Sequence, residues 1–340
     1  MGRMSASESR GPALPSVPGG VALIDLDPAD AGAVRRWSSA MRTAYTGGRE
    51  AVWWEADEQA LRRLRSPKKG RTMVCLAAVL SGETIGGIEV SVDPGEPADV
   101  EIGVLPSHRR HGVGTMLLDA AAARLGAAAR IWQAEASGDE GVAFALAHGF
   151  AVGNREHRML LDLPAPSRGR APEPPEGVTI RSFTGACPED VVADWAALVA
   201  QMDEDVPMGE LTRRTATRGD VEEVRRHEQR MDAQGWTLVR SIAHVDGAPA
   251  GYTVMFVSRH DPAIITQDDT LVERSVRGRG IGRALKAANL ACLTEVPEAR
   301  DARWIQTYTA FDNHAMLALN RALGFREADT LTILERKEQA

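Results

Sequence analysis

Two stretches of the sequence, VRGRGIGRALK at 276–286 and HRRHGVGTMLL at 108–118, share one skeleton. Each contains an arginine, then two glycines separated by one residue, then the apolar start of a predicted helix. Arg109 and Arg277 lie 168 positions apart (277 − 109), which is about the length of one domain. This spacing suggests that the chain contains two copies of one duplicated domain.

The same order of elements surrounds both stretches. In each half a predicted strand (20–26 and 177–183) precedes two helices, a hairpin, and a strand that leads into the glycines. The spacing between equivalent positions drifts from 157 at the first strand (177 − 20) to 175 at a late Gly-Phe pair (324 − 149), as loop insertions in an internal repeat would produce. The predicted helices before the hairpins span 29–46, 57–66, 188–202 and 219–234.

Composition narrows the class of protein. The chain has 340 residues, a formal net charge of −7, and three cysteines that form no CxxC pair. We therefore expect no nucleic-acid partner, no metal site and no disulfide framework. The scattered cysteines favour a reducing, cytoplasmic location. The sequence contains no run of eighteen apolar residues, so we expect no transmembrane helix, and we expect a monomer or homodimer. The predicted division is a disordered tail at 1–19, domains at 20–163 and 177–338, and a Pro-rich linker at 164–176.

A strand, a glycine-rich turn and a helix together suit phosphate binding. Backbone N–H groups at a helix start are unpaired, the helix dipole adds positive potential there, and glycine lets a phosphate approach closely. The residue pattern excludes two families of phosphate-binding proteins that use this geometry. Neither half has the GxxxxGK[ST] of a P-loop, and residues 278–283 read GRGIGR rather than GxGxxG.

Both halves share Arg-x-x-Gly-x-Gly at a strand end, which resembles the acyl-CoA loop of the GNAT N-acetyltransferases. Leu323-Gly324-Phe325 also matches the end of that family's last helix. The resemblance covers 20–163 and 176–338 and is closest to tandem GNAT proteins of the mycothiol synthase type. It implies an α/β (α+β) fold of two GNAT domains, each with a mixed, mostly antiparallel sheet flanked by helices. It further implies acetyl-CoA as co-substrate and a C-terminal copy that is catalytic, with an N-terminal copy that is degenerate or binds CoA unproductively.

The resemblance assigns CoA-binding positions in both halves. Three arginines and a helix-start asparagine favour the second half as the active one. The predicted CoA-binding residues are Val272, Arg277, Gly278, Arg279, Gly280, Ile281, Gly282, Arg283 and Asn313 in the second half, and Val104, Arg109, Gly112, Val113 and Gly114 in the first.

Acetyl transfer to an amine needs a base, a donor to the oxyanion and a proton for the departing thiolate. The base is expected on the strand before the glycines, where Asp269 matches Glu101 of the first half and Asp268 and Glu273 are rivals. The tyrosine that serves as acid in many family members is replaced by Asn320 and Ala145. Tyr308, on the preceding predicted strand, and water are the substitutes considered.

The acceptor side of the second half carries an acidic cluster, Asp203, Glu204 and Asp205, at the end of a predicted helix. Such a cluster would attract a cationic amine, although most acidic runs are solvated surface. The leading hypothesis is acetylation of a small, cationic primary amine, such as an antibiotic, an amino sugar or an amino acid derivative. The alternatives are acetylation of a protein N-terminus or lysine, and a non-catalytic CoA sensor or scaffold.

Overall fold

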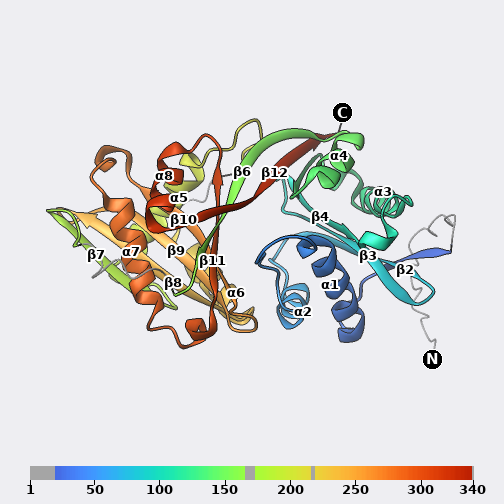
Figure 1. The fold of residues 1–340 in the computed structure, drawn as a ribbon, viewed down its shortest axis with the longest axis horizontal. Coiled ribbons are helices and arrows are strands. Elements are labelled where there is room, and N and C mark those ends of the chain that lie inside the picture. The colour runs from blue at the N-terminus through green and yellow to red at the C-terminus, as the bar shows by residue number, and fades with distance from the viewer. Residues whose placement is uncertain (1–19, 165–172, 216–218, 339–340) are drawn as a thin grey trace, which may run out of the picture.

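A computed structural model describes residues 20–164, 173–215 and 219–338 of the chain. The expected tail at 1–19 and most of the expected linker lie outside the described residues. Figure 1 shows the two halves side by side, joined by one sheet that runs through both. Among the described helices, none is long and apolar enough to span a membrane.

The first half follows the predicted order of elements. Its elements in chain order are β1 (Val21–Asp25), α1 (Ala31–Thr46), α2 (Asp57–Arg65), β2 (Thr72–Leu80), β3 (Glu83–Val92), β4 (Ala98–Val104), α3 (Val113–Leu125), β5 (Ile131–Ala136), α4 (Asp139–Ala147) and β6 (Ala151–Asp162).

The second half repeats that order. Its elements are β7 (Val178–Thr184), α5 (Val192–Asp205), α6 (Val221–Ala233), β8 (Trp236–Val245), β9 (Ala248–Ser258), β10 (Ile264–Val272), α7 (Ile281–Leu293), β11 (Trp304–Ala310), α8 (His314–Leu323) and β12 (Arg326–Lys337).

The hairpins in the two halves turn in the same way. Ser81-Gly82 joins β2 to β3, and Asp246-Gly247 joins β8 to β9; all four residues have positive φ, between 51° and 86°. Positive φ at both central positions is the requirement of a type I′ turn, whose twist matches that of paired strands. The hairpin predicted in the second half is therefore confirmed, with Asp246-Gly247 at its turn.

The last strands of the two halves are exchanged. The sheet order is β1-β2-β3-β4-β5-β12-β6-β11-β10-β9-β8-β7, so β12 of the second half pairs with β5, and β6 of the first half pairs with β11. The halves thus form one twelve-stranded sheet, mostly antiparallel, rather than the two sheets that the repeat suggested. Only β4–β5 and β10–β11 are parallel among the described pairings.

The exchange also crosses the hydrophobic cores. Leu334 of β12 is buried in the core of the first half, and Met159 and Leu161 of β6 are buried in the core of the second half against Leu317. Burial of these side chains would be lost if the halves separated. Each half therefore contributes side chains to the hydrophobic core of the other.

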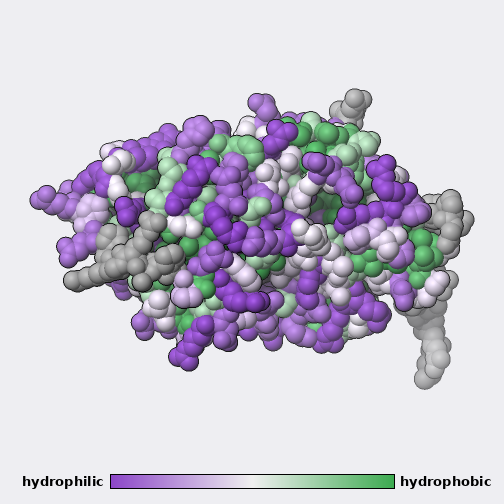
Figure 2. Space-filling view, viewed as in Figure 1, coloured by the Kyte–Doolittle hydropathy of each residue, from purple (hydrophilic) through white to green (hydrophobic). Residues whose placement is uncertain are grey.

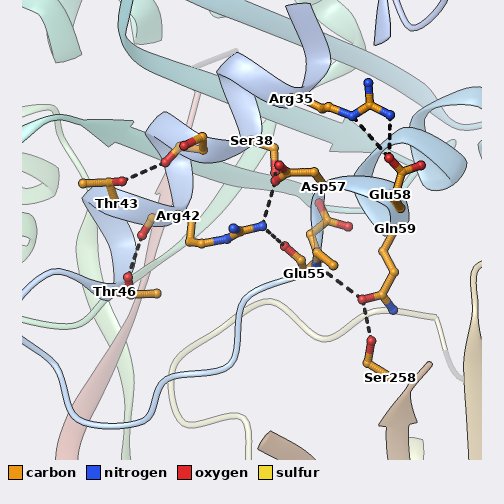
Figure 3. A network of polar contacts seen from close by, with 12 residues as sticks. Arg35, Ser38, Arg42, Thr43, Thr46, Glu55, Asp57, Glu58, Gln59 and Ser258 are labelled. Atoms are coloured by element: carbon orange, nitrogen blue, oxygen red, sulfur yellow. Dashed lines mark hydrogen bonds and ion pairs between the residues drawn. The ribbon is translucent and has the colours of Figure 1, made fainter. Parts of the chain in front are cut away.

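Hydrogen bonds also connect the two halves on the side of α1 and α2 (Figure 3). Gln59 of α2 is 2 % exposed and its Oε1 accepts a hydrogen bond from Ser258 Oγ of β9 at 2.8 Å. The main-chain N–H of Trp53 donates to Gln306 Oε1 of β11 at 3.1 Å. Gln306 and Tyr308 are two residues apart on β11, so their side chains point to the same face of the sheet. The first half therefore packs against this face of β11.

Candidate acetyl-CoA site

The glycine loop of the second half forms the strand-to-helix turn that the motif predicts. β10 ends at Val272, a short 3-10 turn spans Arg274–Val276, and α7 begins at Ile281. Gly278 and Gly280 both have φ of +80°, a left-handed conformation that favours glycine. Gly280 is the N-cap and offers no side-chain cap, so the first N–H groups of α7 are free for an anion.

The motif arginine has the same partner in both halves. Arg277 Nε donates to Val272 O at 2.9 Å, and Arg109 Nε donates to Val104 O at 3.1 Å. The guanidinium therefore ties the loop back to the end of its strand. Arg279 holds the chain before β7 through its bond to Glu176 O at 3.1 Å, and Arg283 is exposed at the helix start.

The acidic cluster divides between two environments. Asp205 is 7 % exposed in its side chain and accepts hydrogen bonds from Arg277 Nη2 at 2.7 Å and from Arg274 Nε at 3.3 Å. Glu204 is exposed. Asp203 lies close enough to Asp269 for its charge to raise the pKa of that carboxyl. Asp203 thus faces the predicted acceptor end, whereas Asp205 faces the predicted diphosphate end.

β10 opens away from β11 directly before the predicted base. The parallel pairing covers only Ile264 to Thr266 of β10, and the register of β10 against β9 shifts between Gln267 and Thr270. A bulge of this kind turns side chains and main-chain groups away from the regular ladder. The unpaired β11-facing edge of β10 beyond Thr266 is therefore available to the amide groups of an extended ligand.

The bulge carries Asp268 and Asp269. Solvent reaches Asp268, yet protein atoms surround it closely enough that burial, and then the charge of Asp269, raise its pKa. Asp269 Oδ2 accepts a hydrogen bond from Tyr252 Oη at 2.8 Å. Burial raises the pKa of Asp269, and the Tyr252 bond partly offsets that rise. Two neighbouring carboxyls with raised pKa values are typical of groups that exchange protons near neutrality.

Three other predicted residues have different surroundings. Glu273 lies beyond the end of β10 and caps the 3-10 turn, where hydrogen bonds from Ser275 Oγ and from Ser275 N, the latter at 2.7 Å, lower its pKa. Asn313 is the N-cap of α8, its Oδ1 accepting from Met316 N at 3.2 Å. Tyr308 lies against Tyr45 of the first half, and burial is the main reason that its pKa is raised.

Sequence reasoning missed a buried lysine. Lys286 of α7 is 2 % exposed, and its Nζ donates to Asn320 Oδ1 of α8 at 2.8 Å. The signal was present in the sequence, since this lysine interrupts the apolar positions of IGRALKAANL.

The first half contains a cavity of about 690 Å³ at its own glycine loop. Its lining includes Gly112 at the loop, Leu118 of α3 and Ala145 of α4, and also Tyr45 of α1 and Glu135 of β5. Its volume is in the range of small-molecule sites. Figure 2 shows apolar residues at the surface over α4, near which this cavity lies. Sequence reasoning did not single out Glu135, whose pKa burial raises.

The first-half loop differs from the second in two details. Arg110, the counterpart of Gly278, adopts a left-handed φ of 66° that a side chain tolerates less well than glycine. The pairing of β4 with β3 runs from Asp99 to Val104 without a register shift, so the bulge of β10 has no counterpart there. Solvent reaches Glu101, yet the protein atoms around it, and then the charge of Glu89, raise its pKa.

A family model described as "Acetyltransferase (GNAT) family" matches residues 35–150. The mycothiol acetyltransferase of Salinispora arenicola (strain CNS-205) is 34% identical over 273 residues, covering 79% of this chain and 83% of that protein. The mycothiol acetyltransferase of Streptomyces coelicolor is 31% identical over 293 residues, covering 84% and 86%.

Solved structures share the fold. A tandem GNAT protein from the clavulanic acid biosynthesis pathway superposes with a TM-score of 0.79 at 24% identity, over 94% of this chain and 99% of that one. A GCN5-related N-acetyltransferase from Sphaerobacter thermophilus gives 0.68 at 20% identity, over 95% and 97%.

Proposed function

The chain belongs to the GNAT acetyltransferases, and from this premise we propose that it transfers the acetyl group of acetyl-CoA to the primary amine of a small, cationic molecule. We place the reaction in the second half. The bulge of β10 carries this proposal, because it sets Asp268 and Asp269 beside the opening between β10 and β11. The first half lacks that bulge.

The co-substrate would enter along the opening. Its diphosphate would meet the free N–H groups at the start of α7, and a Cβ added at Gly278 would meet no atom within 4 Å, so the loop leaves room for it. The pantetheine amides would then pair with the unpaired edge of β10, as a further strand would. This arrangement would bring the thioester carbonyl to main-chain N–H groups near Val272, which would stabilise the oxyanion.

The carboxyls of the bulge would take the proton from the amine. Asp268, which solvent reaches, is the better base, because Asp269 is already held by Tyr252. The pKa of Asp268, raised to about 7 mainly by burial and then by the charge of Asp269, makes it a stronger base than an ordinary aspartate, and a large fraction of it is ionised at neutral pH. Tyr252 and Asp269 would keep the bulge in place and orient its neighbour.

A cationic acceptor fits the charge of the acceptor end. Asp203, Asp268 and Asp269 converge there: after burial, the charge of Asp203 raises the pKa of Asp269, and the charge of Asp269 raises that of Asp268. A bound ammonium would relieve the repulsion between these carboxylates. The relatives named above are mycothiol acetyltransferases, which supports an acceptor of small size.

Release of free thiol from acetyl-CoA, measured against a panel of small amines, protein N-termini and lysine peptides, tests the proposal. We expect turnover with small diamines or amino sugars and little with peptides. Turnover only with peptides would mean that the acceptor is a protein N-terminus or lysine and not a small amine. Tight CoA binding without turnover of any amine would favour the sensor alternative, for which the absent tyrosine at Asn320 is the supporting observation.

A further inference from the structure

Lys286 is a buried cation without a carboxylate among its recorded partners in the described structure. Its Nζ donates to Asn320 Oδ1 at 2.8 Å and lies 5.7 Å from the centre of the Phe325 ring. Burial lowers the pKa of Lys286 to about 7. A lysine in such a place costs stability, and a well-packed apolar side chain would avoid that cost.

The lysine is connected to the opening between β10 and β11. Asn320 Nδ2 donates to Thr309 Oγ1 of β11 at 3.1 Å. Thr309 lies three residues beyond Gln306, where the pairing of β11 with β10 ends, so it belongs to the wall of the opening. Asn320 also occupies the helix position at which the resemblance places the tyrosine acid.

The repeat gives an internal comparison. The counterparts of Lys286 and Asn320 in the first half are Leu118 (286 − 168) and Ala145 (320 − 175), and both line the first-half cavity at its glycine loop. By the repeat, Lys286 and Asn320 occupy the equivalent positions beside the glycine loop of the second half. The two positions carry apolar side chains in the first half, and an amine and an amide in the second.

We propose that Lys286, oriented by Asn320, donates the proton to the departing thiolate of CoA in the second half. This inference rests on the proposed function of that half. It identifies the acid that the sequence leaves unassigned, and it predicts that the first half, with Leu118 and Ala145, has no acid at this position.

The proton balance of the step is complete. The amine nitrogen bonds to the thioester carbon and gives its proton to Asp268; the C–S bond then breaks and its electron pair stays on sulfur. Lys286 transfers one N–H proton to that sulfur and becomes a neutral amine. Asp268 loses its proton to solvent and Lys286 regains one, so the products are the acetylated amine and CoA. A donor with a pKa close to the working pH suits this role.

A titration of bound CoA tests the position of Lys286 without turnover. CoA is bound to the Gly112→Glu protein, in which the glutamate is introduced to repel CoA from the loop of the first half. The absorbance of the thiolate is then followed against pH. We expect the bound thiol to ionise at lower pH than free CoA, because the thiolate and the Lys286 ammonium stabilise each other as an ion pair, and Lys286→Met to abolish that shift. Equal titration of bound and free CoA would overturn the assignment. If CoA does not bind this protein, both the assignment and the proposed function fail.

Turnover provides the second test. We expect Lys286→Met to lower kcat about 10²-fold or more with little change in the KM of acetyl-CoA, and Asn320→Tyr added to Lys286→Met to restore part of the rate. Lys69→Met, at an exposed lysine, is the matched control and should change nothing. A folded Lys286→Met protein with unchanged kcat would overturn the proposal. If no amine is acetylated by the parent protein, the proposed function fails, and the CoA titration alone decides whether Lys286 faces the thiol.

Discussion

Asp205 Oδ2 accepts a hydrogen bond from Arg277 Nη2 at 2.7 Å, so the acidic end of α5 holds the arginine of the glycine loop. The same carboxylate accepts from Arg274, and these bonds lower its pKa. An anion that approaches the loop therefore meets guanidinium groups that are already paired. The contact links the end of α5 to the glycine loop of the second half.

Asp205→Asn should strengthen CoA binding in the second half. Loss of the carboxylate charge frees Arg274 and Arg277 to interact with the diphosphate, and we expect Kd to fall by roughly 3- to 10-fold, about 1 kcal/mol. Calorimetry with CoA on the Gly112→Glu protein measures this, with Glu204→Gln as the exposed neighbouring control. Weaker binding by Asp205→Asn would mean that the carboxylate positions the arginines for the ligand.

Asp268→Asn should reduce kcat about 10²-fold or more. The base acts as a carboxylate, and burial followed by the charge of Asp269 raises its pKa, so the rate of the parent enzyme should rise with pH through a value above that of an ordinary aspartate. In the variant that rise should disappear, leaving only the increase due to free amine. Asp301→Asn, at an exposed position of the same half, is the control. An unchanged pH profile in Asp268→Asn would exclude this residue as the base.

The matched glycines decide which half is catalytic. Gly112 and Gly280 are both helix N-caps with φ of +80°, so glutamate at either imposes the same backbone strain, about 1 kcal/mol, and directs a negative charge toward the loop. We expect Gly280→Glu to abolish acetyl transfer and Gly112→Glu to retain most of it. The reverse result would assign catalysis to the first half, where Glu101 and Glu135 would be the candidate bases.

Lys286→Met should raise the stability of the protein in a pH-dependent way. The folded-state pKa of Lys286, about 7, is below the ordinary lysine value of 10.5, so between these pH values the unfolded chain binds more protons and parent stability rises with pH. The gain from methionine should thus be largest near pH 6, roughly 1–3 kcal/mol, and shrink toward pH 10. Thermal unfolding across this range measures it. A variant less stable than the parent at every pH would contradict the expected cost of the buried cation.

Asp329→Asn should destabilise the junction of the halves. Asp329 of β12 accepts from Arg158 Nε at 2.9 Å and from Arg49 Nε at 2.9 Å, and Arg158, with no exposed surface, also holds the carbonyls of Glu50 and Ala51. Removing the carboxylate leaves Arg158 buried without its counter-charge, at a cost of about 3 kcal/mol.

The same network predicts sensitivity to acid. Burial raises the pKa of Asp329, but hydrogen bonds from Arg158 and Arg49 outweigh it and bring the pKa below its ordinary value. The stability from Asp329 is therefore complete above the unfolded-state pKa and is lost as the pH falls through the folded value. Denaturant unfolding of both proteins should show a difference at pH 7 that narrows below pH 4. A constant difference across this range would exclude ionisation of Asp329 as its source.

The sequence predicted the order of elements because each depends on local signals. Asp30 caps α1 by accepting from Ala33 N, and Asp246-Gly247 supplies the positive φ values of its hairpin. The glycine loops could likewise be located, since glycine at 278 and 280 meets a local backbone requirement. Their ligand, and the roles of Asp268, Asp269 and Tyr308, remain predictions.

Local sequence signals could not identify which residues make long-range contacts with one another. Nothing in the apolar pattern of β6 or β12 distinguishes β5 from β11 as a neighbour, because a strand specifies which face is buried but not which equivalent edge it joins. The repeat makes the two edges alike. The contacts of Asp205 with Arg277 and of Lys286 with Asn320 join residues that are 72 (277 − 205) and 34 (320 − 286) positions apart, at spacings that no helix or strand period sets.

By itself the sequence determined a duplicated GNAT fold, its two strand-turn-helix loops and the absence of the family's tyrosine at 320, since propensity, φ preference and residue identity are properties of short segments. Only the tertiary structure decided that the final strands are exchanged into one sheet, that Asp205 pairs with the loop arginines, and that a buried lysine stands beside Asn320. Burial and ion pairing depend on segments distant in the chain, and their free energies are fixed only when packing brings those segments together.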